Sequence, residues 1–385
     1  MIDTRMALCW PRGLDARRFL QCYWQKAPLL VRGALPGFRD RLPRARLAAL
    51  AQREDVESRM IARTRRGDGY RYRVEHGPQN ARSLARLERP DATLLVQGVE
   101  AHVAQARAVF DAFGFVPLAR RDDLMVSDAS PGGGVGPHVD SYDVFLLQAR
   151  GRRSWRIARA FDEALDEDAP LKILARFRAE QEFVLEPGDF LYLPPGVAHD
   201  GIALDACATW SIGFRAPGAR ELAHDWLAFV DDRFDRDARY ADPDLQMQRS
   251  GAWLSDQFVE RSRRMLGRLV FDRARFEEFL GAYLTEPKAH VRFVAPARPI
   301  SFERFVETAR INGVALAAAS RMLHRGRYLF INGEVATVPM RARAHARRLA
   351  DHRSLDGAHL PADVDGGRWA NALYDWYCSG YIRLR

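Results

Sequence analysis

Two histidines and one aspartate are the residues of this sequence with the strongest indication of chemistry. His138 and Asp140 are two positions apart, so on an extended strand both side chains leave the same face. His199 comes from a later stretch whose pattern also indicates a strand. Two imidazoles and one carboxylate on a rigid β scaffold form the facial triad that holds iron(II) and leaves three coordination positions open. The alternative is that the three are unrelated polar groups on the surface.

The residues around the histidines favour a shared metal ion over that alternative. The stretch 131–137 (PGGGVGP) directly precedes His138, and its glycines let the backbone pass close to a metal or ligand without Cβ clashes. The turn sequences EPGD and PPG, at 186–189 and 194–196, bracket an apolar strand just before His199. We therefore expect the two histidines and the aspartate to bind one metal ion.

Arg153 is a second candidate for a chemical role. An iron centre with three open positions suits a bidentate 2-oxo acid and dioxygen, and the far carboxylate of that acid needs a cation. A guanidinium pairs with a carboxylate through two parallel hydrogen bonds. Arg153 shares a strand face with Trp155 and Ile157, which predicts that it is partly buried. Arg152 and Arg156 share the opposite face and are expected to be solvated.

Longer stretches of the sequence follow a family pattern. They lie at 122–127, 131–140, 142–145, 151–155, 194–199 and 211–217. In these stretches the chain resembles the JmjC-type cupin ribosomal oxygenases of bacteria. The likeness looks closest to the branch that hydroxylates an arginine of ribosomal protein L16 in the large subunit, and it extends more weakly over nearly the whole chain.

The resemblance implies an enzyme, a dioxygenase that depends on Fe(II) and uses 2-oxoglutarate and O2 as co-substrates, of the [protein]-arginine 3-hydroxylase type. It implies His138, Asp140 and His199 as metal ligands, with no further catalytic residue. It implies that Arg153 and Ser127 bind the distal carboxylate of 2-oxoglutarate. It also implies a ribosomal protein as the substrate and a homodimer as the assembly.

The sequence offers three candidates for contact with the substrate. A cationic side chain needs carboxylates or an aromatic face near the iron. Asp128, Tyr142 and Asp143 lie close to the metal ligands in the sequence and are our candidates for these contacts. The alternative for Asp143 is a structural hydrogen bond at the start of a strand.

Three other functions stay open on the sequence alone. The first is hydroxylation of a histidine in a ribosomal protein. The second is another metal-dependent cupin chemistry, an isomerase or a dioxygenase without a co-substrate, although Arg153 argues against it because such sites need no second carboxylate anchor. The third is a non-catalytic cupin and winged-helix protein that binds nucleic acid or the ribosome.

The hydrophobic patterns predict an α+β protein in three parts. From 124 to 214 strands and turns alternate, which is typical of a double-stranded β-helix, the cupin or JmjC jelly roll. Apolar residues at helical spacing follow, and Asn332-Gly333 between two apolar strands predicts a hairpin. The expected parts are a JmjC/cupin catalytic domain with N-terminal helices at 1–217, a helical dimerisation region at 218–294 and a winged-helix-like C-terminal domain at 295–385.

The N-terminal residues are expected to pack on this jelly roll. The periodicities predict helices at 15–26, 42–52 and 93–113, and strands at 29–31, 56–60 and 70–74. The acidic and then mixed segment 161–178 is expected to cover one end of the barrel.

Composition adds weaker constraints. The 385 residues carry 59 Lys plus Arg and 50 Asp plus Glu, a formal net charge of +9, which would suit a nucleic-acid partner. The basic stretch 341–348, however, places its arginines on several faces of a helix. We therefore favour general surface charge and do not expect direct binding of nucleic acid.

The cysteines and the apolar runs indicate the compartment. The four cysteines are far apart, with no C-x-x-C pair, which argues against disulfides and against a zinc site. No apolar run approaches the length of a membrane span. We expect a cytoplasmic protein without a membrane partner.

Overall fold

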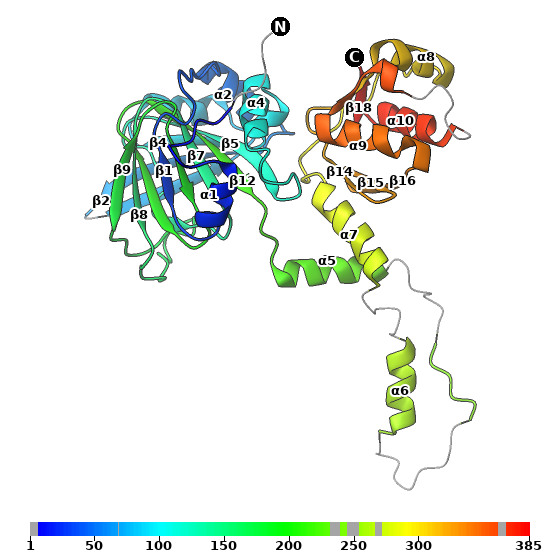
Figure 1. The fold of residues 1–385 in the computed structure, drawn as a ribbon. Helices are drawn as coiled ribbons and strands as arrows, with labels where there is room; N and C mark the ends of the chain where they lie inside the picture. Colours follow the sequence, from blue (N-terminus) through cyan, green and yellow to red (C-terminus); the bar gives the residue numbers. More distant parts are fainter. Residues whose placement is uncertain (1–6, 68, 232–238, 245–253, 266–271, 361–366) are drawn as a thin grey trace.

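The chain folds into three parts that follow one another in sequence. The computed structural model describes residues 7–67, 69–231, 239–244, 254–265, 272–360 and 367–385. Figure 1 shows a β barrel covered by helices, then a helical region that leads away from it, then a mixed domain beside the barrel. The expected α+β order of jelly roll, helices and C-terminal domain is confirmed.

Two antiparallel sheets form the jelly roll. The larger sheet has the order β1 (Leu29–Val31), β10 (Phe190–Leu193), β7 (Val144–Arg150), β12 (Cys207–Phe214), β5 (Arg121–Ala129), β4 (Ala92–Val96), β2 (Ser58–Arg66) and β3 (Gly69–His76). The smaller sheet has the order β6 (His138–Val139), β11 (Ala198–Ala203), β8 (Arg153–Ala158) and β9 (Gln181–Leu185). Neighbouring strands are thus far apart in the chain, which brings distant residues to one interior.

The two faces of β7 show how the barrel is layered. Phe145 and Leu147 point outward into the main hydrophobic core, where Phe145 lies 5.3 Å from the ring of Phe19 between centroids. Val144 and Leu146 point the other way, into the cluster shared with the smaller sheet. Since side chains alternate along a strand, the helices cover one face and leave the other for a cavity.

Phe19 lies in the first of these covering helices. Helix α1 (Ala16–Cys22) begins after Asp15, whose carboxylate accepts a hydrogen bond from the amide of Arg18 at 2.7 Å. Helix α2 (Arg44–Ala51) buries Leu47 and Leu50 in the same core. Both helices lie within the ranges expected from the sequence.

The expected helix at 93–113 is wrong. Residues Ala92–Val96 form β4, a fully buried strand inside the large sheet. Gly98, with a φ of 63°, ends that run, and helix α4 (Ala104–Ala112) begins only afterwards. A short apolar run that is buried on both faces has no period that separates strand from helix.

The helical region consists of α5 (Ala219–Asp231), α6 (Asp256–Met265) and α7 (Arg273–Thr285). Trp226 of α5 packs edge-on against Phe279 of α7, with ring centroids 5.4 Å apart. Helix α6 projects away from the rest of the molecule (Figure 1) and exposes Phe258 and Val259. All three helices lie where the apolar spacing predicts helices.

The C-terminal domain combines helices with two small sheets. Its elements are α8 (Phe302–Asn312), β13 (Val314–Leu316), β14 (Met322–Arg325), β15 (Tyr328–Ile331), β16 (Glu334–Thr337), α9 (Arg343–His352), β17 (Ser354–Leu355), α10 (Arg368–Cys378) and β18 (Ile382–Leu384). The expected hairpin is present, because Asn332 and Gly333 join β15 to β16 with φ angles of 50° and 88°. Trp369 and Trp376 of α10 fill the core of this domain.

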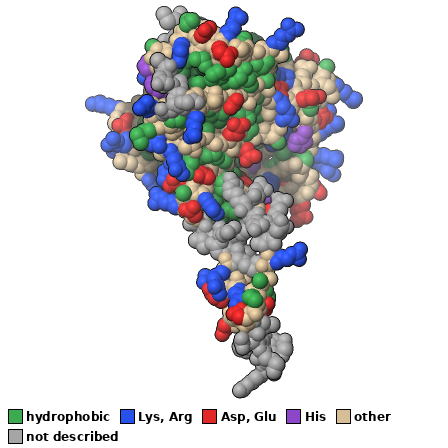
Figure 2. Space-filling model, turned by 90° about the vertical axis from the view of Figure 1, so that its right-hand side faces the viewer, with side chains coloured by type: hydrophobic (Ala, Val, Ile, Leu, Met, Phe, Trp, Pro, Cys, Tyr) green, Lys and Arg blue, Asp and Glu red, His purple; other side chains and the backbone are tan. Residues whose placement is uncertain are grey.

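The C-terminal domain is docked on the barrel through Arg321. Its guanidinium donates to the backbone oxygens of Asp122 at 2.6 Å and Leu118 at 3.2 Å, and also to that of Arg121. On the face shown in Figure 2, basic side chains are scattered among acidic ones and do not gather in one patch. No helix in the described part of the chain is long and apolar enough to cross a membrane.

Candidate metal centre and co-substrate cavity

The strand pair β6–β11 brings the predicted ligands together. His138 and His199 are direct partners in this antiparallel pair, and their ring centroids lie 4.2 Å apart. Asp140 follows β6, and its Oδ2 lies 3.7 Å from Nε2 of His199. One potential ligand atom from each residue lies within 4.8 Å of the others, and among the described residues this is the one such group of three or more.

Each imidazole ring is oriented by a backbone oxygen. Nδ1 of His138 lies 2.8 Å from the oxygen of Gly136, and Nδ1 of His199 lies 3.0 Å from that of Val197. A carbonyl only accepts hydrogen bonds, so both rings carry a proton on Nδ1, and Nε2 is the ring atom available to a metal ion. Metal-binding histidines are commonly held in this way.

Burial sets the charge state of the cluster. Desolvation, reinforced by the neighbouring His138, lowers the pKa of His199 to about 3, so this ring stays neutral. Burial raises the pKa of Asp140, against the opposing effects of His138 and Tyr142. A neutral His199, a second imidazole and one carboxylate that is costly to ionise alone suit a divalent cation, and this donor set fits iron(II).

A cavity of about 580 Å³ surrounds the cluster between the two sheets. One wall comes from the smaller sheet, and the other comes from the interior face of β5, β7 and β12. Residues 170–173 close part of it, as expected for the segment 161–178. The lining residues used below are Arg59, His76, Asp122, Asp123, Met125, Ser127, Tyr142, Arg153, Trp155 and Lys288.

Arg153 lies deep in this cavity with donors to spare. It is 4% exposed, and its Nη1 donates to Oγ of Ser127 at 3.1 Å. Its Nε and Nη2 atoms are buried and have no hydrogen-bond partner among the residues that the structure describes. A buried guanidinium with two unmatched donors suits a carboxylate ligand. Ser127, which the resemblance implies as a second group for the distal carboxylate, thus lies beside Arg153.

Two of the three predicted substrate contacts lie elsewhere. Asp128 is fully buried and pairs with Arg44 at 2.7 Å and Arg150 at 3.1 Å. Asp143 is also fully buried and accepts from the hydroxyl of Tyr192 at 2.6 Å, the structural alternative considered for it. Neither carboxylate lines the cavity, whereas Tyr142 does and is 40% exposed.

Other carboxylates line the cavity in their place. Asp123, Met125 and Ser127 share one face of β5, so the alternation that points Ser127 inward also points Asp123 inward. The same alternation turns Asp128 outward. Counting back by twos from Ser127 would have found Asp123 in the sequence, whereas Asp122 and Lys288 required the tertiary structure.

Comparison with families of known proteins identifies two domains in the chain. Residues 108–222 match the JmjC domain family, and residues 268–383 match the ROXA-like winged helix family. The jelly roll and its His-Asp-His cluster define the class, a JmjC-domain oxygenase of the 2-oxoglutarate-dependent type. The chain belongs to the ribosomal oxygenase family that combines this domain with a ROXA-like winged helix.

One relative matches the chain over almost its full length, and a second matches it over part of its length. The chain is 32% identical over 384 residues to the ribosomal protein uL16 3-hydroxylase of Escherichia coli (strain K12). This alignment covers 99% of each protein. It is 35% identical over 244 residues to a probable ribosomal oxygenase of Haemophilus influenzae, covering 62% of this chain and 57% of that one.

Two structures of the Escherichia coli ribosomal oxygenase YcfD share the fold. One matches with a TM-score of 0.87 at 30% identity, covering 99% of this chain and 100% of the other. A complex of that protein with cobalt and 2-oxoglutarate matches with a TM-score of 0.83 at 30% identity, covering 98% and 99%.

Proposed function

We propose that this protein is an Fe(II)- and 2-oxoglutarate-dependent hydroxylase that acts on an arginine of ribosomal protein uL16. The observation that carries the proposal is the cavity itself. It holds a His-Asp-His cluster and, in the same interior, a buried arginine with unmatched donors. The similarity to the uL16 3-hydroxylase over 99% of both chains supports the choice of substrate.

His138, Asp140 and His199 would hold the iron ion. The hydrogen bonds from Nδ1 to Gly136 and Val197 fix both rings, so that each Nε2 is presented to the interior. Iron(II) bound there would supply activation of dioxygen, coupled to oxidative decarboxylation of 2-oxoglutarate, for hydroxylation of a C–H bond. The protein contributes position and exclusion of side reactions.

Arg153 and Ser127 would bind the distal carboxylate of 2-oxoglutarate. The planar guanidinium can offer Nε and Nη2 to two carboxylate oxygens, because Nη1 is already directed at Ser127. Trp155, which is buried and whose ring centroid lies 5.8 Å from the guanidinium carbon, would shield this end of the cavity from water. The buried surroundings strengthen such an ion pair relative to one in water.

Tyr142 and the carboxylates of Asp122 and Asp123 would receive the substrate side chain. A guanidinium is recognised by carboxylates and by aromatic faces, and all three residues line the cavity. Asp128 and Asp143 have structural roles in this proposal. A histidine substrate, which is neutral for most of the physiological pH range, would make weaker use of two carboxylates.

We also infer that the protein forms a homodimer. The exposed side chains of Leu227, Phe258 and Val259 on α5 and α6 suit the homodimer implied by the family likeness. We keep 1–217, 218–294 and 295–385 as catalytic, dimerisation and winged-helix-like parts, in a cytoplasmic enzyme.

The test is to incubate the purified protein with Fe(II), 2-oxoglutarate, dioxygen and uL16, and to locate added oxygen by mass spectrometry. We expect one oxygen on an arginine and a matching yield of succinate. Matched uL16 variants with that arginine or a neighbouring histidine replaced would distinguish the two hydroxylases. Succinate formation without any oxidised ribosomal protein would refute the substrate assignment but not the oxygenase.

A further inference from the structure

We propose that Lys288 is an internal counter-ion of the substrate site, which holds Asp123 in the resting protein and yields it to the cationic side chain of the substrate. This inference rests on the proposed function, since it assigns regulation to the same cavity. Lys288 belongs to neither sheet of the barrel. It comes from the segment 286–300, between the last helix of the helical region and the first helix of the C-terminal domain.

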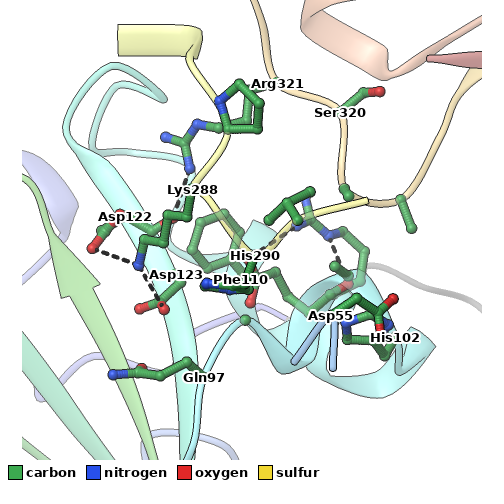
Figure 3. Close-up of a pocket in the computed structure, with 18 of the residues that line it drawn as sticks. Asp55, Gln97, His102, Phe110, Asp122, Asp123, Lys288, His290, Ser320 and Arg321 are labelled. Atoms are coloured by element: carbon green, nitrogen blue, oxygen red, sulfur yellow. Dashed lines mark hydrogen bonds and ion pairs between the residues drawn. The ribbon is translucent and has the colours of Figure 1, made fainter. Parts of the chain in front are cut away.

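Lys288 bridges two carboxylates from outside the barrel. Its Nζ donates to Oδ2 of Asp123 at 3.0 Å and to Oδ2 of Asp122 at 3.2 Å, as Figure 3 shows. The lysine lines the active-site cavity and also a smaller cavity of about 80 Å³ between the barrel and the C-terminal domain. A cation of the chain itself is thus seated on the groups that suit a substrate cation.

The two carboxylates differ in the ion-pair partner that each would keep if Lys288 moved away. Asp122 also pairs with Arg215, whose Nε lies 3.4 Å from Oδ1 of Asp122. Asp123 has Lys288 as its one ion-pair partner in the described part of the chain. Its side chain is the more buried of the two, 13% exposed against 30% for Asp122. Asp123 is therefore the carboxylate that needs a replacement cation, and an entering guanidinium would supply it.

The charges of the ion pairs favour the exchange. The two carboxylates and their ion-pair partners Arg215 and Lys288 sum to zero, so a substrate cation that approaches Asp123 adds a positive charge next to Lys288. Repulsion between it and the lysine falls when Lys288 shifts to Asp122 alone. The shift is small, because Lys288 already contacts both carboxylates.

The choice of lysine favours release. Only three lysines occur in the chain, Lys26, Lys172 and Lys288, among 59 basic Lys and Arg residues. An ammonium is a strongly hydrated point charge, whereas a guanidinium can bind a carboxylate through two parallel hydrogen bonds. An arginine side chain therefore displaces a lysine more readily than it would displace another arginine.

The site of exchange lies at the outer end of β5. Asp123 and Ser127 share one strand face and are about 13 Å apart along the strand, at roughly 3.3 Å for each of four residues. Ser127 contacts Arg153, so 2-oxoglutarate would bind at one end and the substrate at the other. Lys288 therefore competes with the substrate and not with the co-substrate.

The C-terminal domain holds the segment that carries Lys288. The amide of Gly333, in the hairpin, donates to Oγ1 of Thr285 at 3.1 Å, and Phe293 packs against Tyr381 with ring centroids 4.8 Å apart. These contacts lie on either side of Lys288 in the sequence. The C-terminal domain thus takes part in substrate selection without any contact to nucleic acid.

The test compares Lys288→Met, the native protein and Lys288→Arg. Each is loaded with Mn(II) and 2-oxoglutarate without oxygen, and titrated with a uL16 peptide containing arginine and with the same peptide containing neutral citrulline. Removing the competing charge should tighten binding of the arginine peptide about fivefold, equivalent to about 1 kcal/mol. Lys288→Arg should weaken it, and citrulline affinity should be the same in all three.

Equal or weaker binding of the arginine peptide by Lys288→Met would overturn the proposal, as would equal shifts for citrulline. If Lys288→Met no longer binds 2-oxoglutarate, the comparison between Lys288→Arg and the native protein is used instead. Weaker binding of the arginine peptide by Lys288→Arg then supports the proposal, and equal or tighter binding refutes it. Hydroxylation is measured separately by mass spectrometry. If the native protein hydroxylates uL16 but the three proteins do not show the expected order of affinities, only the role of Lys288 is refuted. If they show that order without hydroxylation, only the proposed function is refuted. If the native protein does not bind the arginine peptide, both are refuted.

Discussion

His138 and His199 face each other across the antiparallel pair β6–β11, and each ring contacts the backbone oxygen two residues before it, Gly136 and Val197 respectively. The two imidazoles are therefore oriented by the same local geometry on two strands. Both rings therefore direct Nε2 toward the carboxylate of Asp140. Hydrogen bonds of this kind fix the orientation of histidines that bind a metal ion.

Replacing His199 by alanine should remove iron-dependent 2-oxoglutarate turnover, because the cluster loses one of three donors. Groups that only orient ligands are typically worth about 10- to 100-fold, so loss of a ligand should exceed about 100-fold. The measurements are Mn(II) titration by calorimetry and succinate formation. His76→Ala is the matched control, because His76 lines the same cavity outside the cluster. Native-like metal affinity in His199→Ala would refute the ligand assignment.

Replacing Arg153 by methionine should raise KM for 2-oxoglutarate by about 10- to 150-fold, the equivalent of roughly 1.5–3 kcal/mol for a charge-assisted hydrogen bond. Metal affinity without the co-substrate should be retained. Arg152→Met is the control, since Arg152 is exposed and pairs with Asp205 at 2.9 Å. Initial rates at varied 2-oxoglutarate concentration provide the check, and equal KM values for the two variants would contradict the assignment.

Asp123→Asn and Asp128→Asn should have different consequences. Asp123 lines the cavity, so its loss should raise KM for the arginine substrate about tenfold and leave KM for 2-oxoglutarate unchanged. Asp128 is buried between Arg44 and Arg150, so its loss should cost about 3–5 kcal/mol of unfolding free energy. Steady-state kinetics and urea unfolding separate the two effects. A substrate-specific defect in a stable Asp128→Asn would restore that residue as a substrate contact.

Glu100 should make the protein less stable as the pH rises. Burial, followed by the charge of Asp123, raises the pKa of Glu100 to about 7. Between its ordinary pKa of 4.5 and about 7, the folded protein keeps a proton that the unfolded chain has lost, so unfolding free energy falls with rising pH across that window. Glu100→Gln cannot ionise, and its side-chain oxygen can still accept from the amide of Leu124, as the Glu100 carboxylate does at 2.9 Å.

We therefore expect Glu100→Gln to be more stable than the native protein at pH 8, by about 1–3 kcal/mol. The two proteins should approach equal stability near pH 5. Urea unfolding at several pH values measures the difference. A constant difference from pH 5 to pH 8 would show that ionisation of Glu100 is not its cause.

Gly281→Ala should weaken the contact between α7 and the C-terminal hairpin. A Cβ at Gly281 would lie 2.4 Å from ring atoms of Phe330, which is buried and cannot move aside cheaply. Overpacking of this kind typically costs about 1–3 kcal/mol. Gly218→Ala is the control, because no heavy atom lies within 4 Å of a Cβ added there. Thermal unfolding and hydrogen exchange in β15 should show the loss for Gly281→Ala alone.

The sequence by itself determined the residues whose role depends on local periodicity. Spacing of two places His138 and Asp140 on one side of an extended segment, although β6 itself ends at Val139, and the same alternation separates Arg153 from Arg152. The Asn332-Gly333 hairpin follows from a turn that requires two positive φ angles. These features involve neighbours in the chain, so no distant contact is needed to predict them.

Features that depend on contacts between residues far apart in the sequence were decided only by the tertiary structure. Residues 92–96 form a strand because β2 and β5 pair with them on both edges and all five residues are buried, which their composition does not reveal. Asp128 and Asp143 are adjacent in sequence to cavity residues, yet partners from other elements hold their buried carboxylates outside it. Lys288 reaches Asp123 across a separation of 165 residues. Such a contact is set by how the parts pack together, and no local pattern in the sequence encodes it.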